Sequence, residues 1–366
     1  MADTSLKALL LVGGFGTRLR PLTLSKAKPL IEFINKPILV HQIEALKAVG
    51  VSEIVLAINY HPEQMQSILT ELENTYKIKI SISKEEIPLG TAGPIGLAKK
   101  YLETTGGNEI FVFNSDVTCA FPLQQMLDFH RKHGKEGTLA VTKVKDPSRF
   151  GVIISDSNRK ITNFIEKPKE FVGDNINAGL YIFNKKFLNR VEAVPTSIER
   201  EVFPKMASEG ELYSFLLEGF WADIGQPKDY LKGTALFLDN LRQTNSPDLA
   251  SGDNIIGNVV IDKTAKISNE CLIGPNVVIG PGVTIEKGVR IKNAVIMDGT
   301  KVNEASYISE SIIGWRNTIG KWVRIEGLSV FGEEVTIKDE ILIEQNIILP
   351  NVTIKATPKK GDIILS

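Results

Sequence analysis

A loop that combines glycines with a basic side chain follows the first apolar run of the chain. It contains Gly13, Gly14, Gly16, Thr17 and Arg18. Glycines allow a ligand to approach the backbone closely, and the amide N–H groups of such a loop can donate to phosphate oxygens. The spacing of the glycines matches neither a P-loop nor the dinucleotide-binding fingerprint. The loop is a candidate phosphate site, although a tight turn with solvated charges would contain the same residues.

This loop lies in a stretch that is basic although the whole protein is neutral. No Asp or Glu occurs between Asp3 and Glu32, whereas the stretch contains five basic residues: Lys7, Arg18, Arg20, Lys26 and Lys28. Lys and Arg together number 43 in the chain, and so do Asp and Glu. A local excess of positive charge beside a glycine-rich loop favours the binding of a polyphosphate.

Strand-like and helical segments alternate from Lys7 to about Asn240. This alternation predicts an α/β domain with a Rossmann-like, mixed but mostly parallel sheet. Ligands of such sheets bind at the carboxyl ends of strands, where both the glycine loop and Asp116 fall. Apolar spacing predicts a helix over residues 41–50 that ends at Gly50. The expected strands cover residues 8–12, 51–59, 77–83 and 110–113, with a hairpin over 151–154 and 161–165.

The C-terminal third repeats an aliphatic residue every six positions. The first seven are Ile255, Ile261, Ile267, Ile273, Ile279, Ile285 and Ile291. A second aliphatic column four residues later runs from Val259 to Val295. After a slip near Met297–Ser311 the phase resumes and continues to Leu349. A hexapeptide period predicts a parallel β-helix, whereas a β-sandwich would alternate with period two. We therefore expect a ligand-binding domain over residues 1–240, a polar linker over 241–254 and a β-helix over 255–366.

Motifs in both halves resemble those of the sugar-1-phosphate nucleotidylyltransferase family. They are LVGGFGTRLRPLTL, KPLIEF, NSDV, GTAGP, FIEKP, NAGLYIF, PTSIEREVFP, FWADIGQPKDYL and IIGWRNTIGKWVRIEG, followed by the hexad tail. This resemblance spans nearly the full length and implies a nucleotidyltransferase domain followed by a left-handed parallel β-helix. It favours the members of the family that transfer GMP from GTP to mannose 1-phosphate and release pyrophosphate.

The resemblance implies a role for the cations and carboxylates of these motifs. Arg18 would clamp the triphosphate and stabilise the leaving pyrophosphate, and Lys28 would hold phosphates beside it. Lys167 would pair with the sugar phosphate. Asp116 and Asp223 would hold Mg²⁺, with Mn²⁺ as an alternative, because Mg²⁺ takes one or two carboxylates together with phosphate oxygens and water. A helix N-cap is the other common use of a residue placed like Asp116.

The same likeness implies two binding pockets. In the nucleotide pocket Glu85 would accept from the N–H groups of guanine, and in the sugar pocket Glu166 would accept from two hydroxyls. Without the resemblance, Glu166 and Lys167 would be interpreted as an exposed charged pair at the end of a strand. The nucleotide pocket would comprise Gly13, Gly14, Gly16, Thr17, Glu85 and Gly90, and the sugar pocket Gly151, Glu166, Asn177 and Gly179.

The implied reaction requires no protein base. A phosphate monoester has a second pKa of about 6, so the attacking oxygen is mostly ionised near neutral pH. Catalysis then depends on alignment and on suppression of charge repulsion. The histidines need no chemical role, and we expect surface or packing positions for all of them: His41, His61, His130 and His133.

Other functions remain open at this point. A related enzyme using glucose 1-phosphate with ATP, UTP or dTTP would share these residues. A regulatory subunit that binds the nucleotide sugar without turnover would be expected to lose Arg18, Lys28, Asp116 or Asp223, and all four are present. A hexapeptide acyltransferase generally takes its base from a histidine of the β-helix, and this chain has none after His133.

Composition excludes several partners. A zero net charge argues against a nucleic-acid binder, and no apolar run approaches the ~20 residues needed to span a bilayer. The N-terminus has no secretory signal, and two distant cysteines suit a reducing cytoplasm. The repeat turns Trp315 and Trp322 outward, which predicts a homo-oligomer through the β-helix, a complex with an alpha-type subunit, or packing on the chain's own first domain.

Overall fold

The computed structural model describes residues 5–14, 16–59, 62–104 and 106–365. It divides into two compact units, Met1–Gly14 with Leu39–Trp221 and Phe15–Ile38 with Ala222–Ser366. The segment Phe15–Ile38, which the sequence assigns to the first domain, thus clusters with the C-terminal residues. The boundaries at residues 240 and 255 stay a prediction. Each helix of the described ranges is too short or too polar to span a bilayer.

A mixed sheet of nine strands, counted over the described residues, forms the centre of the first unit. Its path has the order β10-β9-β11-β6-β1-β4-β5, and β8 and β12 branch from β11. Strands β5, β4, β1 and β6 are parallel, as expected. Strand β11 pairs antiparallel with β6, β8 and β9, and β9 and β10 form the expected hairpin. Strand bounds are β1 Leu6–Leu11, β4 Val51–Ile58, β5 Lys79–Lys84, β6 Glu109–Asn114, β7 Val117–Cys119, β8 Gly137–Lys143, β9 Gly151–Ser155, β10 Ile161–Glu166, β11 Asn175–Asn184 and β12 Leu212–Leu216.

Helices complete this unit. The predicted helix at residues 41–50 is α2, and it ends where Gly50 adopts a φ of 91°. The helix bounds are α2 Ile38–Ala48, α3 Pro62–Tyr76, α4 Gly93–Leu97, α5 Lys99–Leu102, α6 Leu123–His133 and α7 Phe203–Ser208, with a 3-10 helix at Lys185–Arg190 and a π-helix at Ile198–Val202. A core of aliphatic and aromatic side chains between sheet and helices includes Leu9, Val112, Tyr181 and Phe203.

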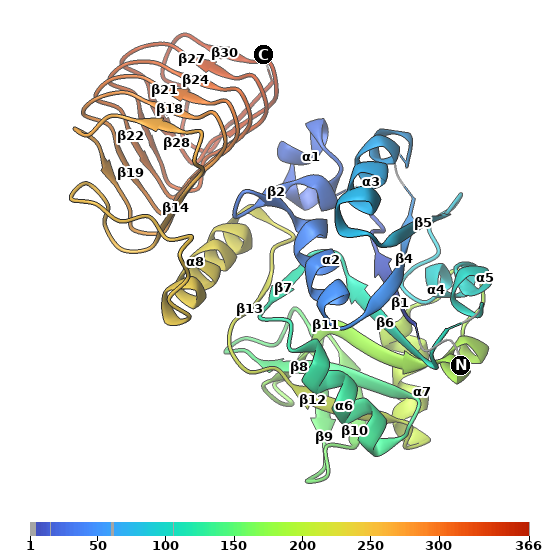
Figure 1. Cartoon of the computed structure of the whole chain (residues 1–366). Coiled ribbons are helices and arrows are strands. Elements are labelled where there is room, and N and C mark those ends of the chain that lie inside the picture. Colours follow the sequence, from blue (N-terminus) through green and yellow to red (C-terminus); the bar gives the residue numbers. More distant parts are fainter. Residues whose placement is uncertain (1–4, 15, 60–61, 105, 366) are drawn as a thin grey trace. The chain divides into compact units, whose positions relative to one another are not determined.

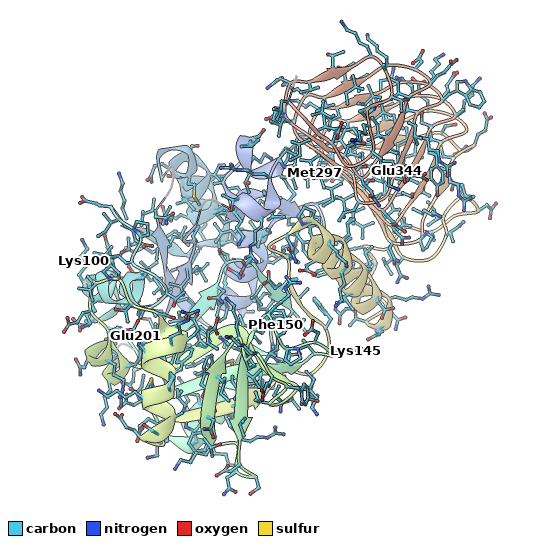
Figure 2. The ribbon with its side chains drawn as sticks, turned by 180° about the vertical axis from the view of Figure 1, so that it is seen from behind. Lys100, Lys145, Phe150, Glu201, Met297 and Glu344 are labelled. Carbon is cyan, nitrogen blue, oxygen red and sulfur yellow. The ribbon has the colours of Figure 1, made fainter. Side chains whose placement is uncertain are left out.

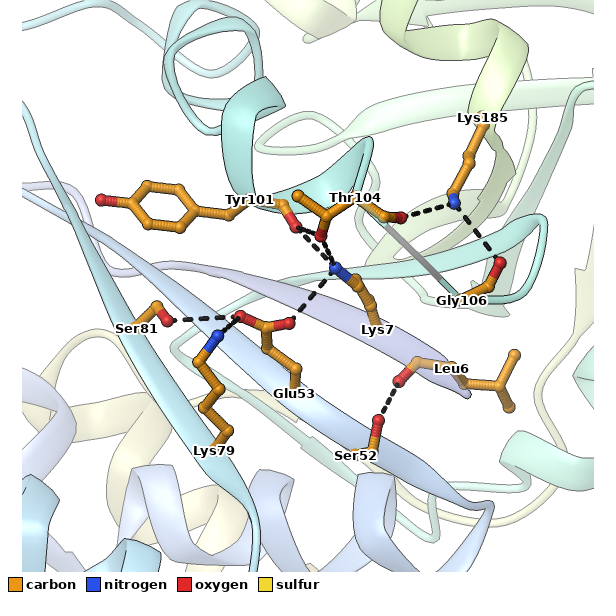
Figure 3. Close-up of polar contacts among 10 residues, drawn as sticks. All are labelled: Leu6, Lys7, Ser52, Glu53, Lys79, Ser81, Tyr101, Thr104, Gly106 and Lys185. Atoms are coloured by element: carbon orange, nitrogen blue, oxygen red, sulfur yellow. Dashed lines mark hydrogen bonds and ion pairs between the residues drawn. The ribbon is translucent and has the colours of Figure 1, made fainter. Parts of the chain in front are cut away.

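The amino ends of the parallel strands hold a buried polar network (Figure 3). Lys7 of β1 pairs with Glu53 of β4 at 3.2 Å and donates to the carbonyl of Tyr101 at 2.7 Å. Glu53 also accepts from Lys79 of β5 at 2.7 Å, and these two lysines lower the pKa of Glu53 against the opposing effect of burial. Lys7 therefore stabilises the sheet at the end opposite to the glycine loop and does not add to the basic stretch around that loop.

The second unit contains the predicted parallel β-helix, drawn in orange and red in Figure 1. Its short strands stack into three parallel sheets, and the described residues give them seven, six and five strands. The first sheet has β14 Val259–Ile261, β17 Val277–Ile279, β20 Ala294–Ile296, β23 Ile312–Ile313, β26 Val330–Phe331, β29 Ile347–Ile348 and β31 Ile363–Ile364. The second has β15 Lys266–Ile267, β18 Thr284–Ile285, β21 Lys301–Val302, β24 Thr318–Ile319, β27 Thr336–Ile337 and β30 Thr353–Ile354, and the third has β16 Leu272–Ile273, β19 Arg290–Lys292, β22 Tyr307–Ser309, β25 Arg324–Glu326 and β28 Leu342–Glu344.

The position of the phase slip differs from the prediction. Val259 pairs with Val277, which is a full three-hexad turn, but Val277 then pairs with Ala294 in a shorter one. Ala294 therefore faces the interior, and Val295 faces outward instead of inward. The turn from β26 to β29 is short as well, so Ile348 is buried in the interior and Leu349 is only partly buried. One residue fewer in a turn moves every later side chain of that strand to the other face.

The segment Phe15–Ile38 packs in a cluster with the outward face of the first β-helix sheet and with helix α8 (Pro227–Gln243). Trp315 belongs to this cluster and is fully buried, whereas Trp322 is 67% exposed. Packing of Trp315 on the chain's own N-terminal residues was one of the expected alternatives. The segment contains a 3-10 helix at Thr17–Leu19, α1 at Leu22–Ser25, a 3-10 helix at Lys28–Leu30, β2 at Glu32–Phe33 and β3 at Lys36–Pro37.

Two of the histidines have packing roles, as predicted, and His61 lies outside the described residues. His130 Nδ1 and His133 Nε2 lie 2.9 and 2.7 Å from the same hydroxyl, that of Thr138. The ring of His133 also stacks on Tyr213 at 4.4 Å. Burial disfavours the charged imidazolium and lowers the pKa of each histidine from 6.5 to about 4.

These depressed pKa values predict an acid-dependent loss of stability. Between pH 6.5 and 4 the unfolded chain binds protons that the folded histidines do not, so the free energy of unfolding falls as the pH falls. The slope approaches about 1.4 kcal/mol per pH unit for each histidine. Urea midpoints across this range should therefore change more in the wild type than in the double variant His130→Gln, His133→Gln. Equal slopes in the two proteins would contradict the assignment.

Candidate functional site

The glycine loop lies at the carboxyl end of β1, where the alternation of strands and helices places it. The Val12 amide donates to the carbonyl of Ala57 at 3.0 Å, which extends the pairing of β1 with β4 by one residue. Gly13 and Gly14 are exposed, and the Gly14 amide donates to Oδ1 of Asn59 at 3.3 Å. Gly14 has a φ of 98°, a conformation that side chains rarely adopt. The loop thus presents backbone to solvent at the ligand-binding edge of the sheet.

Glu85 follows β5 at the same edge and is 4% exposed. Its amide donates to the Ile58 carbonyl at 2.9 Å, and its Oε2 accepts from the Leu89 amide at 3.1 Å. Its Oε1 has no hydrogen-bond partner among the described residues and would lie 3.8 Å from a Cβ atom at Gly13. Burial raises the pKa of this carboxyl above its ordinary value. The geometry therefore offers an unused acceptor beside the glycine loop.

The turn that contains Gly90 is held by the stretch around Thr196. Gly90 has a φ of 74°, and a Cβ there would lie 2.5 Å from the Thr196 carbonyl oxygen. Next to it, the Thr91 hydroxyl donates to Oε2 of Glu199 at 2.6 Å and accepts from the Ile198 amide at 2.9 Å. Glu199 lies in the π-helix, and such helices are frequent at functional sites. Thr91 lies in GTAGP and Glu199 in PTSIEREVFP, and neither motif predicted this contact across 108 positions.

Three residues expected at the sugar come together on the β9–β10 hairpin. Gly151 pairs with Glu166 across the hairpin, and a Cβ at Gly151 would lie 2.9 Å from Oε2 of Glu166. Lys167 Nζ lies 3.2 Å from Oε1 of Glu166. The side chain of Glu166 is 15% exposed and that of Lys167 is 59% exposed, so the carboxylate lies deeper than the ammonium. Of the pair, only Lys167 is largely open to solvent.

Asn177 and Gly179 lie in an irregularity of β11, between the pairs that Asn177 and Tyr181 make with β8. Asn177 donates to the Tyr181 hydroxyl at 2.8 Å and accepts from the Gly179 amide at 3.1 Å. Gly179 has a φ of 74°, and a Cβ there would lie 2.8 Å from Nδ2 of Asn114. This contact explains why no side chain fits at position 179.

Tyr181 is a buried residue of this region that the sequence analysis missed. Burial raises its pKa, with the charges of Glu199 and Glu166 adding to the effect, so both carboxylates act on this one hydroxyl. Trp221 borders the same strand, since its Nε1 donates to the Ala178 carbonyl at 2.9 Å and its ring meets that of Phe150, labelled in Figure 2, edge-on at 5.7 Å. A tyrosine in a run of apolar neighbours, such as Tyr181 in NAGLYIF, is ordinarily a core residue, so the sequence gives no indication of such a role.

Asp116 lies in the turn between β6 and β7. The buried Gln42 of α2 fixes both ends of this turn, because its Nε2 donates to the carbonyls of Asn114 at 2.9 Å and Val117 at 3.2 Å. Asp116 itself is partly exposed. A rigid turn at the carboxyl end of a strand is a suitable support for a metal-binding carboxylate.

The remaining candidates belong to the second unit. Thr17 and Arg18 are exposed in their 3-10 helix. A Cβ at Gly16 would lie 2.7 Å from the Thr23 side chain and 3.3 Å from the Cβ of Lys28, so Gly16 and Lys28 are neighbours. Asp223 ends β13 (Trp221–Asp223), and its Oδ1 accepts from the Gly225 amide at 2.8 Å.

Carboxylate oxygens are ligands that Mg²⁺ prefers, and Asp116 and Asp223 each carry such a group. No group of three or more His, Cys, Asp or Glu that could hold a metal occurs in the part of the chain that the structure describes. The donor chemistry of an Asp side chain suits a hard cation that takes its other ligands from phosphate and water.

Comparison with known proteins shows the family of the chain. The family model described as nucleotidyl transferase matches residues 7–240, and the model described as GMPPB C-terminal domain matches residues 255–364. The chain is 51% identical over 98% of its length to mannose-1-phosphate guanylyltransferase 1 of Arabidopsis thaliana, all of which is covered. It is 54% identical over 98% of its length to the mannose-1-phosphate guanylyltransferase catalytic subunit beta of Drosophila pseudoobscura pseudoobscura, of which 96% is covered.

The chain belongs to the mannose-1-phosphate guanylyltransferases. A solved structure supports the fold of part of the chain: the crystal structure of HddC from Yersinia pseudotuberculosis is similar with a TM-score of 0.52 and 29% identity. That likeness covers 62% of this chain and 97% of HddC. The resemblance inferred from the sequence motifs is thus confirmed, together with the α/β domain and the parallel β-helix.

The contact at Gly90 leads to a prediction with a matched control. Gly90 and Gly134 have φ values of 74° and 65°, but a Cβ at Gly134 would meet no described atom within 4 Å, whereas one at Gly90 would overlap the Thr196 carbonyl. Gly134→Ala should cost about 1 kcal/mol of unfolding free energy because of its φ alone. Gly90→Ala should cost about 2–3 kcal/mol because the backbone must also move. Urea unfolding measures both, and equal losses would show that the contact is unimportant.

Proposed function

We propose that this chain transfers GMP from GTP to mannose 1-phosphate and releases pyrophosphate. Full-length likeness to curated mannose-1-phosphate guanylyltransferases, in both the nucleotidyl transferase and the C-terminal portion, carries the proposal. Glu85 and the glycine loop would bind the nucleotide base, and Arg18, Lys28 and Asp223 would act on its phosphates.

Guanine is the base that the loop edge of the first unit suits. Guanine presents adjacent N1–H and N2–H donors, and a carboxylate accepts from both. Glu85 has an unused oxygen beside Gly13, and the raised pKa of its carboxyl reflects the cost of leaving that oxygen buried without a donor. A bound guanine would supply the missing donors. Gly13, Gly14, Gly16, Thr17 and Gly90 would line the rest of the nucleotide pocket.

The hairpin β9–β10 and the irregular part of β11 would bind the sugar phosphate. The mostly buried Glu166 would accept from two hydroxyls of mannose, and the exposed Lys167 would pair with the phosphate. Asn177 and Gly179 would form the adjoining wall, where Tyr181 holds the Asn177 amide in place. Gly151 leaves room for the Glu166 carboxylate.

The chemical step would be an in-line attack by a phosphate oxygen of mannose 1-phosphate on the α-phosphorus of GTP. A bond forms between that oxygen and phosphorus, and the bond to the β-phosphate oxygen breaks, so the electron pair leaves with pyrophosphate. Arg18 and Lys28 would neutralise the charge that builds on this leaving group. Nucleotidyl transferases of this family generally use a divalent metal. We propose Mg²⁺, with Mn²⁺ as a substitute, held by Asp116 and Asp223, and its chemistry would be to neutralise phosphate oxygens.

The assembly and location are also proposals. The exposed Trp322 favours contact through the β-helix, either with a second copy of this chain or with an alpha-type subunit. Both cysteines, Cys119 and Cys271, are buried and free, in keeping with a cytoplasmic protein.

A substrate panel tests the function. The purified full-length protein would be assayed for pyrophosphate release with GTP, ATP, UTP and dTTP, each with mannose 1-phosphate and glucose 1-phosphate. We expect GTP with mannose 1-phosphate to give the highest kcat/KM and a chelator to abolish turnover. A preference for another pair would replace the substrates, and binding of GDP-mannose without turnover would indicate a regulatory subunit.

Substitution of Arg18 tests its place in the reaction. An interaction that strengthens in the transition state appears in kcat, whereas one that is equal in the ground state appears in KM. Arg18→Ala should lower kcat by about 10²–10³-fold, as loss of a preorganised charge-stabilising group does, with a smaller change in the Kd for GTP. Arg20→Ala is the matched control from the same exposed stretch and should retain most of the activity. A change in KM alone would make Arg18 a binding residue.

A further inference from the structure

The β-helix carries an apolar column on its outside as well as on its inside. Val260, Val278, Val295 and Ile312 lie in register on successive strands β14, β17, β20 and β23, and all are buried. They pack in one cluster with residues of the N-terminal segment, namely Leu19, Leu22, Ile31, Phe33, Ile34 and Ile38. Met297, labelled in Figure 2, belongs to the same cluster. The segment that contains Arg18 and Lys28 therefore has its apolar support on the β-helix.

A polar triad lies within this apolar contact. Trp315 is fully buried, and its Nε1 donates to Oε2 of Glu32 at 2.8 Å. The other carboxylate oxygen of Glu32 pairs with the ammonium of Lys26. The Lys26 ammonium in turn lies 4.5 Å from the centre of the Trp315 ring. Each of the three side chains thus contacts the other two.

Two further contacts hold Glu32 and the turn that follows it. The Tyr230 hydroxyl of α8 donates to the Glu32 carbonyl. After β2, Ile34 and Asn35 adopt φ values of 50° and 60°, and the side-chain Nδ2 of Asn35 donates to the Ile279 carbonyl at 2.8 Å. These contacts join the β2–β3 hairpin to both the helix and the β-helix.

The position of the triad in the chain relates it to the phosphate-binding residues. Lys26 and Glu32 lie on either side of Lys28, two and four residues away, and Lys28 neighbours Gly16. We propose that Lys26, Glu32 and Trp315 form a positioning device, through which the β-helix fixes the segment that presents Arg18 and Lys28 to the triphosphate. This inference rests on the proposed function in one respect, the binding of nucleotide phosphates by these two cations. In this proposal the β-helix positions the phosphate-binding segment, in addition to the role in assembly that the sequence predicts.

The physical reason is the placement of the chain around Lys28. Lys26 and Glu32 flank Lys28 in the sequence, and both contact Trp315 of the β-helix. Loss of the indole donor removes the hydrogen bond between Trp315 and Glu32 and loosens the segment that contains Lys28, which should weaken nucleotide binding.

Trp315→Phe in the full-length protein tests the proposal, because phenylalanine keeps a buried ring and removes the N–H donor. We expect a Kd and a KM for GTP about five- to tenfold higher, because only part of the cost of losing a hydrogen bond to a charged group is passed on to GTP binding. The KM for mannose 1-phosphate should stay within about twofold, and kcat should fall by less than it does in Arg18→Ala, because both cations remain and only their placement changes. Glu32→Gln keeps an acceptor for the indole and should have a smaller effect than Trp315→Phe.

Trp322→Phe is the matched control, since it makes the same substitution at an exposed tryptophan of the same β-helix. It should leave the GTP parameters unchanged. A lower melting temperature for Trp315→Phe with unchanged Kd and KM for GTP would overturn the proposal and leave Trp315 as a packing residue. An equal rise in KM for both substrates would overturn it as well. If the wild type uses another nucleoside triphosphate, the proposed function fails, and the same comparison with that triphosphate still decides the triad.

Discussion

Burial of the outward apolar column of the β-helix is the constraint on which the second unit depends. Parallel pairing in register places Val260, Val278, Val295 and Ile312 one above another, so the apolar residues of successive turns form a continuous stripe. An aliphatic side chain gains about 1.5–3 kcal/mol when it leaves water, which gives the chain a strong reason to cover this stripe. The residues that cover it come from the motif that also supplies Arg18 and Lys28. A requirement of the scaffold thereby fixes the position of the segment that contains the proposed phosphate-binding residues.

Apolar contact stabilises the packing of the N-terminal segment on the β-helix but is not directional. Hydrogen bonds and ion pairs within the cluster are directional, and they orient the segment. A carboxylate beside a buried indole costs free energy unless its oxygens have donors, and Glu32 has both Lys26 and Trp315. The Glu32 carboxylate reaches its Trp315 donor in one position of the segment, and it would lose that donor if the segment shifted along the apolar stripe. The same carboxylate that costs desolvation therefore selects a single register for the loop.

Periodicity predicted those parts of the molecule that depend on neighbours in sequence. The hexad predicted the β-helix, and the run before Gly13 and the pair of strands at residues 151–165 were placed correctly. Contacts between distant residues were not predictable in this way. Trp315 meets Glu32 across 283 positions, and nothing local distinguishes it from the exposed Trp322. Lys7 was grouped with the basic loop by proximity in sequence, although a strand separates them and Glu53 holds it at the other end. Tyr181 and Glu199 were missed because their surroundings arise only in the fold: burial and two carboxylates raise the pKa of Tyr181, and Glu199 accepts from Thr91, 108 positions away.

The amino and carboxyl ends of the strands in the first sheet differ in how many of their buried polar atoms have partners. At the amino ends, Glu53 forms ion pairs with Lys7 and Lys79. The buried side-chain atoms without a partner in the described residues lie toward the carboxyl ends: Ser83 and Glu85 at the end of β5, Gln42 at the β6 turn, Thr118 in β7 and Asn175 at the start of the antiparallel β11. Native proteins leave few such atoms, so their concentration at one edge needs a cause. A ligand that brings its own donors and acceptors to that edge provides one, and the unsatisfied edge is the one that the glycine loop and Asp116 share.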